Sequence, residues 1–207
     1  MIYKMKINTI IFDLGGVLVD WDPKNVYREV FNGDEEKTNW FLNNICTFEW
    51  NAEQDGGRTI HEAEKKLINI HPEYEDLIKL YYKEWHNMFS GVIEENVRIF
   101  KHLIDSKKYN IYALTNWSAE KWDKALELFP FFKDFDGVVV SGQENCKKPD
   151  MKIFNIIMNR FNIEPNSAVY IDDNFENFLA GKSIGLQAIH YSNTDLKIEL
   201  NKFEILL

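Results

Sequence analysis

The spacing of the apolar positions changes along this chain. Residues 6–12 form a short segment, rich in β-branched side chains, that ends at Asp13 and two glycines. A run of this length bounded by turn residues predicts a buried strand leading into a tight turn. From residue 22 to residue 107 the apolar side chains instead recur at helical spacing, which predicts a succession of helices.

Two features mark individual helices inside this long block. Thr59 followed by Glu62 has the pattern of a capping box, which predicts the start of a helix. Aromatic and aliphatic residues over 74–89 fall at positions i, i+3 and i+4, so we expect one amphipathic helix there. The segment 54–57 (Gln-Asp-Gly-Gly) interrupts the pattern, and we expect a break between helices at that point.

The second half of the chain alternates between the two kinds of spacing. Alternation of strands and helices of this length predicts an α/β fold with a mostly parallel sheet and right-handed crossovers. The helical block, residues 21–90, is then an insertion after the first strand, and residues 1–20 and 91–207 form the α/β core. We expect strands at 109–115, 135–141, 167–173 and 186–191, and helices at 118–129, 150–161 and 174–182.

The composition excludes several classes of protein. Hydrophobic residues make up 45% of the 207 residues, which is enough to build a core and excludes a wholly disordered chain. The longest apolar runs have four residues, far short of the ~20 that a membrane-spanning helix requires. Lys and Arg number 24 and Asp and Glu 33, so the net charge of −9, without a basic stripe, argues against a nucleic-acid partner.

The cysteines and histidines show no pattern typical of a metal site. Cys46 and Cys146 lie 100 positions apart without a CxxC partner, so they could form one disulfide at most. No apolar segment of signal-peptide length precedes Asp13, and we expect reduced thiols in a cytoplasmic protein. The histidines have no ligand spacing, and we expect structural roles for His61, His71, His86, His102 and His190.

Reactive side chains stand at the ends of the predicted strands or in the loops that follow them. In a parallel sheet the carboxyl ends of the strands meet at one edge, where such folds place their active site. We therefore expect four distant stretches of the chain to converge on one small volume. These stretches carry Asp13, Thr115 with Asn116, Lys147 with Lys148, and Asp172 with Asp173.

This set of groups suits a magnesium ion together with a phosphoryl group. Carboxylates with an open side are the oxygen ligands that Mg²⁺ prefers. A lysine beside them fits a transferred phosphoryl group, whose anionic oxygens need more positive charge than one metal supplies. The turn Leu14-Gly15-Gly16 can offer backbone amides to an anion. The Thr115 hydroxyl can donate one more hydrogen bond, and a carboxylate oxygen free of the metal can attack phosphorus.

The same residues resemble the four signatures of the haloacid dehalogenase superfamily. They occur in order as Phe-Asp13-Leu-Gly-Gly-Val, Leu-Thr115-Asn, Lys148-Pro-Asp and Ile-Asp172-Asp173. The chain is similar to the subgroup with a helical cap inserted after the first strand, over roughly residues 7–191. This resemblance implies a Rossmann-like core, a cap over the site and, as in most of the superfamily, Mg²⁺-dependent hydrolysis of a small phosphate ester.

The resemblance also implies a role for each matching residue. Asp13 would be the nucleophile and a metal ligand, and the Gly15 carbonyl would be a second ligand. Asp173 would be the principal ligand of the fourth signature, with Asp172 in the outer sphere of the metal or sharing that role. Lys148 would neutralise the nucleophile and the transferred phosphoryl group.

The remaining implied contacts concern the phosphoryl group and the leaving group. Thr115, the Asn116 backbone and the turn 14–16 would bind the phosphoryl oxygens. In the cap, the stretch 50–57 resembles the loop that reaches over the site and selects the leaving group. The residues that we expect to contact the substrate there are Trp50, Gln54 and Asp55. Trp117, just after the second signature, is also placed near the expected crevice.

One position departs from the family pattern. The common form is Asp-x-Asp, whose second Asp protonates the leaving group and later activates water, and here that position is Gly15. The form Asp-x-Gly-x-Val resembles a subgroup similar to α-D-glucose-1-phosphate phosphatases. Because an anomeric phosphate leaves more readily than an alkyl phosphate, a sugar phosphate is the substrate that we expect. A cap residue or the substrate itself could also supply the proton.

Two other functions stay open at this point. A 2-haloacid dehalogenase uses the same nucleophile without metal, and the Leu-Thr115-Asn segment resembles its second signature. Carbon chemistry, however, has no use for paired carboxylates at 172–173, and that subgroup carries an aromatic residue where Gly15 stands. A chain that lost its acid/base could also be a regulatory protein that only binds phosphate and Mg²⁺. The sequence does not determine the oligomeric state.

Overall fold

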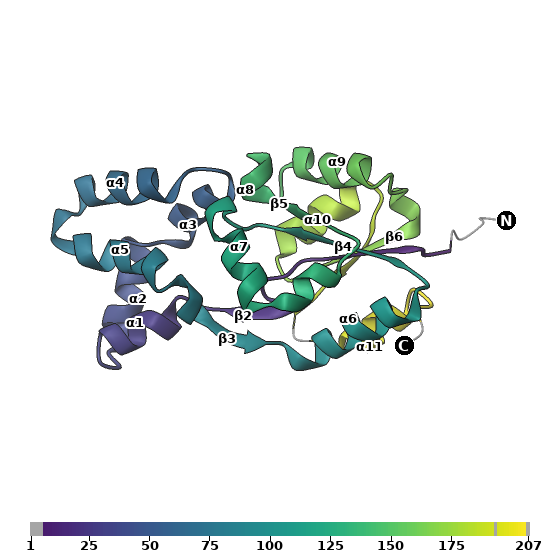
Figure 1. The fold of residues 1–207 in the computed structure, drawn as a ribbon, viewed down its shortest axis with the longest axis horizontal. Coiled ribbons are helices and arrows are strands. Elements are labelled where there is room, and N and C mark those ends of the chain that lie inside the picture. Colours follow the sequence, from purple (N-terminus) through teal and green to yellow (C-terminus); the bar gives the residue numbers. More distant parts are fainter. Residues whose placement is uncertain (1–5, 193, 206–207) are drawn as a thin grey trace.

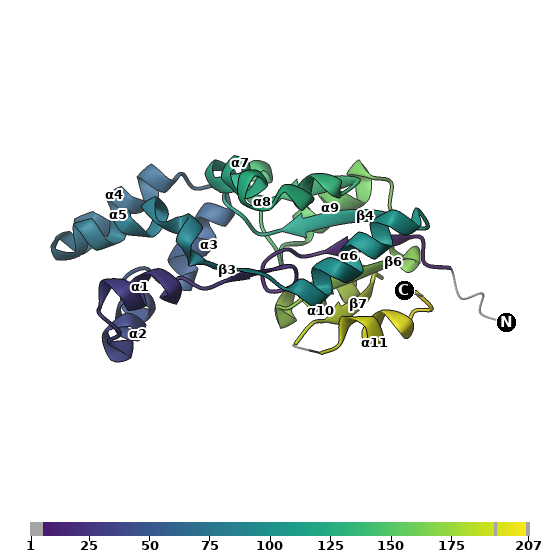
Figure 2. The ribbon, with the colours of Figure 1, turned by 60° about the horizontal axis from the view of Figure 1, so that its bottom comes forward.

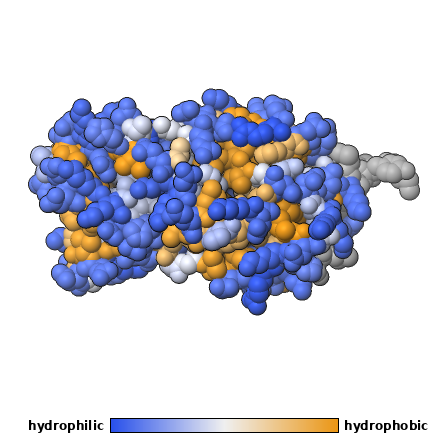
Figure 3. Space-filling view, in the orientation of Figure 1, coloured by the Kyte–Doolittle hydropathy of each residue, from blue (hydrophilic) through white to orange (hydrophobic). Residues whose placement is uncertain are grey.

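The computed structural model describes residues 6–192 and 194–205. Within these residues the chain forms two lobes, an α/β core and a helical cap (Figure 1). The space-filling view shows hydrophilic residues over much of the visible face of both lobes, with apolar patches between them (Figure 3). None of the helices in the described chain is both long enough and apolar enough to cross a membrane.

A parallel sheet forms the centre of the core. Five strands of the described chain pair in the order β5-β4-β1-β6-β7. The central strand β1 (Thr9–Phe12) is buried over its whole length, as its apolar sequence favours. The predicted strands are therefore confirmed, although each is shorter than expected. The other bounds are β4 (Asn110–Thr115), β5 (Gly137–Val140), β6 (Ala168–Asp172) and β7 (Gln187–His190).

Each face of the sheet has its own layer of helices. Successive side chains of a strand point to opposite faces, so Phe12 packs in one apolar cluster and Ile11 in another. Helices α6, α7 and α11 cover the Phe12 face, and α9 and α10 cover the Ile11 face (Figures 1 and 2). Their bounds are α6 (Glu94–Ser106), α7 (Ala119–Leu128), α9 (Met151–Arg160), α10 (Phe175–Ser183) and α11 (Leu196–Asn201).

The register of the sheet aligns the strand ends that carry reactive residues. Phe12 pairs with Ala113 of β4 and with Ile171 of β6. Because these strands run parallel, Asp13 and Asp172, which follow the paired residues, come side by side at one edge. Three short helical segments complete the described core: 3₁₀ helices at Pro130–Asp134 and Pro165–Ser167, and α8 (Ser141–Glu144).

The cap is a helical bundle with an aromatic centre. The ring of Tyr27 lies 4.8 Å from that of Phe41 and 6.2 Å from that of Tyr81. The predicted capping box of Thr59 and Glu62 is present at the start of α4. The elements of the cap are α1 (Lys24–Val30), α2 (Glu35–Asn44), α3 (Phe48–Asp55), α4 (Ile60–Ile70), α5 (Glu75–Lys83), and 3₁₀ helices at Pro72–Tyr74 and Trp85–Met88.

The prediction of one helix over 74–89 is wrong. Helix α5 ends at Lys83, a 3₁₀ turn follows, and β3 (Phe89–Val92) then pairs antiparallel with β2 (Val19–Trp21). Apolar spacing mimics a continuous helix here because the 3₁₀ turn also buries part of its side chains. The pairing partner lies about 70 residues away, so local spacing cannot reveal it. This ribbon joins the two lobes, and the boundaries that we expected at 20/21 and 90/91 fall within it.

A buried hydrogen bond ties the turn after Asp13 to the core, and its loss has a predictable cost. Asn96 of α6 donates from Nδ2 to the Val17 carbonyl at 2.7 Å. Asn96→Ala leaves this buried carbonyl without its partner, so we expect the free energy of unfolding to fall by ~1–3 kcal/mol. Asn44→Ala is the matched control, because that amide donates to the Trp40 carbonyl at 2.8 Å in an exposed position. Urea unfolding followed by circular dichroism measures both; equal losses would contradict the role of burial.

Candidate active site

Asp13 stands at the carboxyl end of the central strand with both of its oxygens held. Oδ1 accepts a hydrogen bond from the Leu14 amide at 2.7 Å, and Oδ2 pairs with Lys148 Nζ at 2.9 Å. Burial raises the pKa of Asp13 well above its ordinary value; Lys148 opposes this rise, whereas Asp172 and Asp173 add to it. The carboxylate therefore depends on nearby positive charge to stay ionised.

Lys148 is a fully enclosed cation at the centre of the site. Its Nζ donates to Asp172 Oδ2 at 2.7 Å and to the Leu114 carbonyl at 2.8 Å, in addition to its pair with Asp13. Burial alone would lower the pKa of Lys148, but Asp13 and Asp172 hold it above its ordinary value. The ammonium group is therefore charged and lies where a transferred phosphoryl group would need it.

The loop that carries Lys148 is fixed by the side chain of Asn116. The Asn116 Nδ2 group donates to the Lys148 carbonyl at 3.0 Å, and the Lys148 amide donates to Asn116 Oδ1 at 2.8 Å. From the sequence we expected only the Asn116 backbone to act, on the phosphoryl group. The side chain instead joins the loops after β4 and β5, a contact between residues 32 positions apart.

The two carboxylates at the end of β6 have different surroundings. Asp172 is fully buried, and its oxygens already accept hydrogen bonds from Lys148, the Tyr170 hydroxyl, and the amides of Asn174 and Asn177. Asp173 is exposed as a residue, but the partial desolvation of its carboxyl group, followed by the negative charge of Asp172, raises its pKa. This difference favours Asp173 as the direct metal ligand and Asp172 in the outer sphere.

Two partners of Asp172 were not foreseen from the sequence. Tyr170 lies two positions before Asp172 on β6, so the alternation of the strand puts both side chains on one face. Asn177 lies in the first turn of α10, where its amide faces the strand end. The positions of Tyr170 and Asn177 relative to Asp172 can be seen in the sequence. Neither position is unusual, however, because any strand followed by a helix has residues at these spacings.

The acidic groups of the site form a candidate cation site. One oxygen each from Asp13, Asp172 and Asp173 lie within 4.8 Å of one another. All three donors are carboxylate oxygens. Burial and then mutual repulsion raise the pKa of Asp13 and Asp173, and a divalent cation would relieve that repulsion. Oxygen donors with an open side fit Mg²⁺, which we expected from the sequence.

The turn after Asp13 offers fewer amides to an anion than we expected. The Leu14 amide donates to Asp13, and the Gly16 amide donates to the Val19 carbonyl at 2.9 Å. Two of the three backbone amides that we expected to bind an anion therefore already donate hydrogen bonds within the protein. Gly15 lines the pocket, and among the described residues its amide is not engaged within the turn.

The two glycines of this turn serve different purposes. Gly16 has a φ of +70°, and a Cβ atom there would collide with the Asp173 carboxylate, so only glycine lets the turn approach that group. A Cβ atom on Gly15 would meet nothing within 4 Å. Glycine at position 15 is therefore not required by lack of space.

Thr115 presents a buried hydroxyl without a partner at the end of β4. Among the described residues no group hydrogen-bonds to its Oγ1 atom, although the residue is 1% exposed. A buried polar atom left unpaired is costly, and a bound phosphoryl oxygen would satisfy it. This orphaned hydroxyl fits the phosphoryl-binding role that we expected for Thr115.

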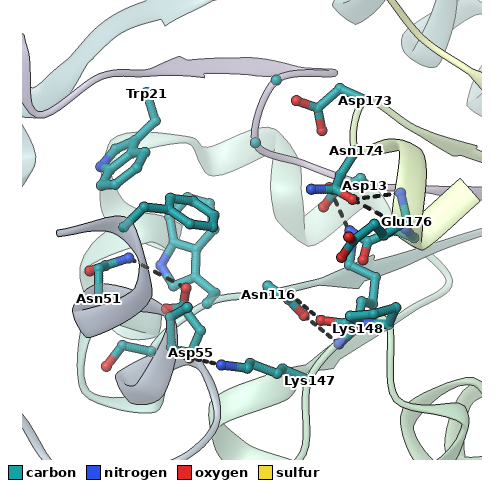
Figure 4. Close-up of a pocket in the computed structure, with 18 of the residues that line it drawn as sticks. Asp13, Trp21, Asn51, Asp55, Asn116, Lys147, Lys148, Asp173, Asn174 and Glu176 are labelled. Atoms are coloured by element: carbon teal, nitrogen blue, oxygen red, sulfur yellow. Dashed lines mark hydrogen bonds and ion pairs between the residues drawn. The ribbon is translucent and has the colours of Figure 1, made fainter. Parts of the chain in front are cut away.

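A pocket of about 890 Å³ opens between the two lobes above these groups. Asp13, Asn116, Lys148 and Asp173 line its core side (Figure 4). The cap contributes a carboxyl group and an amide, and aromatic rings from both lobes form much of the wall. The cap and aromatic residues are Asn51, Asp55, Trp21, Phe48, Tyr82, Trp85, Phe89, Trp117 and Phe175.

Two of the predicted substrate contacts in the cap need correction. Gln54 is buried, and its Nε2 group donates to the Trp50 carbonyl at 2.9 Å and to the Tyr82 hydroxyl at 2.8 Å. Its Oε1 atom accepts from Arg58 at 2.7 Å, so its hydrogen-bonding capacity is used inside the cap. Trp50 packs against Tyr82, and neither Trp50 nor Gln54 lines the pocket. The helical turn of α3 presents Asp55 there instead.

Two further residues line the pocket, His190, for which we expected a structural role, and Trp117. His190 lines the pocket, and its Nε2 atom lies 2.9 Å from the Asp173 carbonyl oxygen. Its place at the end of β7, opposite Asp172 in the register, brings it there. Trp117 lines the pocket as its position after the second signature predicted. Cys46 and Cys146 are free buried thiols.

Comparison with known proteins identifies the family. The model of the haloacid dehalogenase-like hydrolases matches residues 10–191. The chain therefore belongs to this family of hydrolases. The match includes the helical insertion and all of the strand ends described above.

Individual relatives are distant. The chain is 26% identical over 189 residues to the phosphorylated carbohydrates phosphatase of Thermotoga maritima, covering 89% of this chain and 84% of that protein. It is 25% identical over 192 residues to the sesquiterpene phosphatase astK of Aspergillus oryzae, covering 89% of each. The fold resembles HAD family enzyme BT-2542 of Bacteroides thetaiotaomicron, solved with magnesium and inorganic phosphate, with a TM-score of 0.65 and 21% identity, covering 90% and 94% of the chains.

The candidate cation site predicts a stabilising effect of Mg²⁺ that depends on Asp173. An ion that binds only the folded protein raises the midpoint temperature of unfolding. A free ion concentration of ~100 times Kd raises the free energy of unfolding by ~2.7 kcal/mol. We expect Mg²⁺ to raise the midpoint of the wild type and to have little effect on Asp173→Asn. Glu176→Gln, which removes an exposed charge from the same pocket, is the control and should keep the shift. Scanning calorimetry with and without Mg²⁺ tests this; a full shift in Asp173→Asn would refute the assignment.

The buried charge cluster predicts a large, pH-dependent cost for removing Lys148. Lys148→Met leaves two buried carboxylates without their cation, so we expect a loss of ~3–5 kcal/mol in the free energy of unfolding. Without the ammonium group the pKa of Asp13 rises further. When the pKa of a carboxyl group is higher in the folded than in the unfolded state, the free energy of unfolding falls as pH increases. The stability lost in Lys148→Met should therefore be larger at about pH 8 than at about pH 5.

The control for this experiment is Lys152→Met, which removes an exposed lysine from α9 and should change the stability little at either pH. Denaturant titrations at the two pH values give the four differences needed. A loss in Lys148→Met that is the same at both pH values would contradict the proposed dependence on ionised carboxylates.

Proposed function

We propose that this protein is a Mg²⁺-dependent phosphatase that hydrolyses a small phosphorylated metabolite through an aspartyl-phosphate intermediate. The observation that carries the proposal is the convergence of Asp13, Lys148 and Asp173 on one pocket, next to the strand end where the Thr115 hydroxyl is buried without a partner among the described residues. A carboxylate nucleophile, an ammonium group and a cation site together match the charge of a phosphoryl group. The names of the two relatives, both phosphatases, support the same reaction.

The first step is attack of the Asp13 carboxylate on phosphorus. A bond forms between Asp13 Oδ2 or Oδ1 and phosphorus, and the bond between phosphorus and the leaving oxygen breaks in line with it. Lys148 neutralises charge on Asp13 and on the transferred group, while the Thr115 hydroxyl donates to a phosphoryl oxygen. Mg²⁺, when bound by Asp13, Asp173 and the Gly15 carbonyl, supplies positive charge at the phosphoryl oxygens.

The second step is hydrolysis of the aspartyl-phosphate. Water forms a bond to phosphorus, the bond from phosphorus to Asp13 breaks, and inorganic phosphate leaves with the carboxylate regenerated. Helix α3 of the cap lines the pocket across from the strand ends, where it would limit the access of bulk water to this reaction.

We propose a sugar phosphate as the substrate. The wall of the pocket combines aromatic rings with a carboxyl group and an amide, Asp55 and Asn51. Flat apolar faces bordered by hydroxyl groups, as in a hexose, match such a wall. The name of the Thermotoga relative supports carbohydrates, whereas the name of the fungal relative supports an apolar alcohol. A panel of hexose-1-phosphates, hexose-6-phosphates, acyl phosphates and a prenyl phosphate decides between them.

A dehalogenase is the alternative that this panel must exclude. A reaction at carbon needs no divalent cation, so the acidic cluster of Asp13, Asp172 and Asp173 disfavours it. Halide release from 2-chloropropionate in the presence of EDTA would support the dehalogenase. Mg²⁺ binding without turnover of any phosphate ester would support a regulatory protein.

The proposed mechanism predicts that Asp13 is indispensable. Asp13→Asn cannot form the phosphoenzyme, and EDTA removes the cation, so we expect each to abolish phosphate release from the best substrate of the panel. Asp20→Asn, the same change at an exposed position of the pocket, should retain activity. Phosphate release measures turnover, and mass spectrometry of the acid-quenched enzyme detects one added phosphoryl group. Persistent turnover in Asp13→Asn would refute the covalent mechanism.

A further inference from the structure

The site described above lacks a proton donor for the leaving group. The family position for this group is Gly15, which has no side chain, although a Cβ atom there would meet nothing within 4 Å. An alkoxide is a poor leaving group, and a positioned acid is worth ~10²–10⁴ in rate. If the protein hydrolyses ordinary alkyl phosphates, another group must occupy this role.

The geometry of in-line displacement defines where that group must lie. The leaving oxygen departs on the side of phosphorus opposite the attacking Asp13 carboxylate. Asp13, Lys148 and Asp173 border the core side of the pocket, and Asp55 of the cap lies on the opposite side, with Asn116 between (Figure 4). Asp55 therefore lies on the leaving-group side.

Asp55 is held in place by neighbours that are themselves fixed. The backbone amide of Ser118, which follows β4, lies close enough to the Asp55 carboxyl group to lower its pKa, and Asn51 Nδ2 lies 3.5 Å from its Oδ2 atom. The orientation of Asn51 is set by the Tyr82 hydroxyl, which donates to Asn51 Oδ1 at 2.8 Å. The contact with Ser118 joins the cap carboxyl group to the same loop that carries the phosphoryl-binding residues.

The surroundings of Asp55 also suit a group that exchanges protons near neutral pH. Burial raises the pKa of Asp55 to about 7, against the lowering effects of Lys147, the Ser118 amide and Lys148. The other carboxyl groups of the pocket are the nucleophile, the metal ligand, and two exposed residues, Asp20 and Glu176. Asp55 is thus the half-buried carboxyl group of the described pocket to which no role in attack or metal binding is assigned.

We propose that Asp55 of the cap takes over the acid/base role that Gly15 cannot perform. This inference rests on the proposed phosphatase function. As the Asp13–phosphorus bond forms and the bond from phosphorus to the leaving oxygen breaks, the Asp55 carboxyl group gives its proton to that oxygen. When water then attacks the aspartyl-phosphate from the same side, Asp55 accepts the proton of the water and returns to its acid form.

The test compares two leaving groups, because only a poor one requires a proton. Asp55→Asn keeps the shape of the side chain and one acceptor oxygen but cannot transfer a proton. We expect its kcat/KM, which reports the steps up to departure of the leaving group, to fall ~10²–10⁴-fold with an alkyl phosphate such as a hexose-6-phosphate. The fall should be far smaller with p-nitrophenyl phosphate, whose leaving group is stable as an anion, whereas hydrolysis of the shared aspartyl-phosphate affects kcat for both substrates. Glu49→Gln, which removes an exposed carboxylate from the same helix α3, is the matched control and should leave both rates unchanged.

The pH dependence gives a second, independent readout. In the wild type, kcat/KM for the alkyl phosphate should fall as pH rises through about 7, because the acid form of Asp55 is the active one. This limb should be absent in Asp55→Asn. A carbon-13 titration of the Asp55 carboxyl group in the metal-free protein should show the same pKa. The other charged or titratable groups that face or surround Asp55 are Lys147, Lys148, Arg58, Glu53, Tyr81, Tyr82, Asp13 and Asp173.

Space beside Gly15 permits a rescue experiment. Gly15→Asp restores a carboxyl group at the family position, and we expect it to recover at least part of the alkyl phosphate activity lost in Asp55→Asn. Recovery would show that the missing function is proton transfer. Equal losses of kcat/KM in Asp55→Asn on both substrates, or an unchanged pH profile, would overturn the inference and leave Asp55 a binding or structural residue.

These outcomes are distinct from failure of the proposed function. If wild-type protein hydrolyses p-nitrophenyl phosphate with Mg²⁺ and requires Asp13, the phosphatase proposal holds whatever Asp55 does. If the wild type hydrolyses no phosphate ester, both the proposed function and the role of Asp55 are refuted. Circular dichroism and thermal unfolding of each variant show that it is folded.

Discussion

The site depends on one buried cation, Lys148, held between two carboxylates at adjacent strand ends. Its ammonium group contacts Asp13 at 2.9 Å and Asp172 at 2.7 Å with no exposure to solvent. A single charge buried in this way would be very unfavourable, so each member of the cluster is stable only while the others are present. This arrangement is maintained by the sheet register, by the hydrogen bonds between the Asn116 side chain and the Lys148 backbone, and by the donors around Asp172.

The division of the molecule into two lobes separates two tasks. The core supplies the rigid charge cluster, because its groups are anchored on parallel strands. The cap supplies part of the aromatic wall and also Asp55, which lies at the end of a short helix near Ser118 of the core. In the proposed mechanism the core acts on phosphorus, and the cap selects the leaving group and gives it a proton.

Much of the fold and part of the site could be predicted from local pattern. The change from strand to helical spacing gave the α/β core with its insertion, and the four signatures gave Asp13, Thr115, Lys148 and the acidic pair. The helix over 74–89 was wrong because strand β3 is defined by a partner about 70 residues away. The cap contacts were partly misassigned, because position within the helical turn decides whether Gln54 or Asp55 faces the pocket.

The sequence by itself determined which reactive groups exist and that parallel strands would bring their ends together. Period and turn chemistry are local properties, so they can be recognised without knowing the fold. Only the tertiary structure decided that Asp172 is saturated by protein donors while Asp173 stays open, and that Asp55 lies across the pocket from Asp13. Those distinctions arise from contacts between distant segments, which packing, rather than any local pattern, selects.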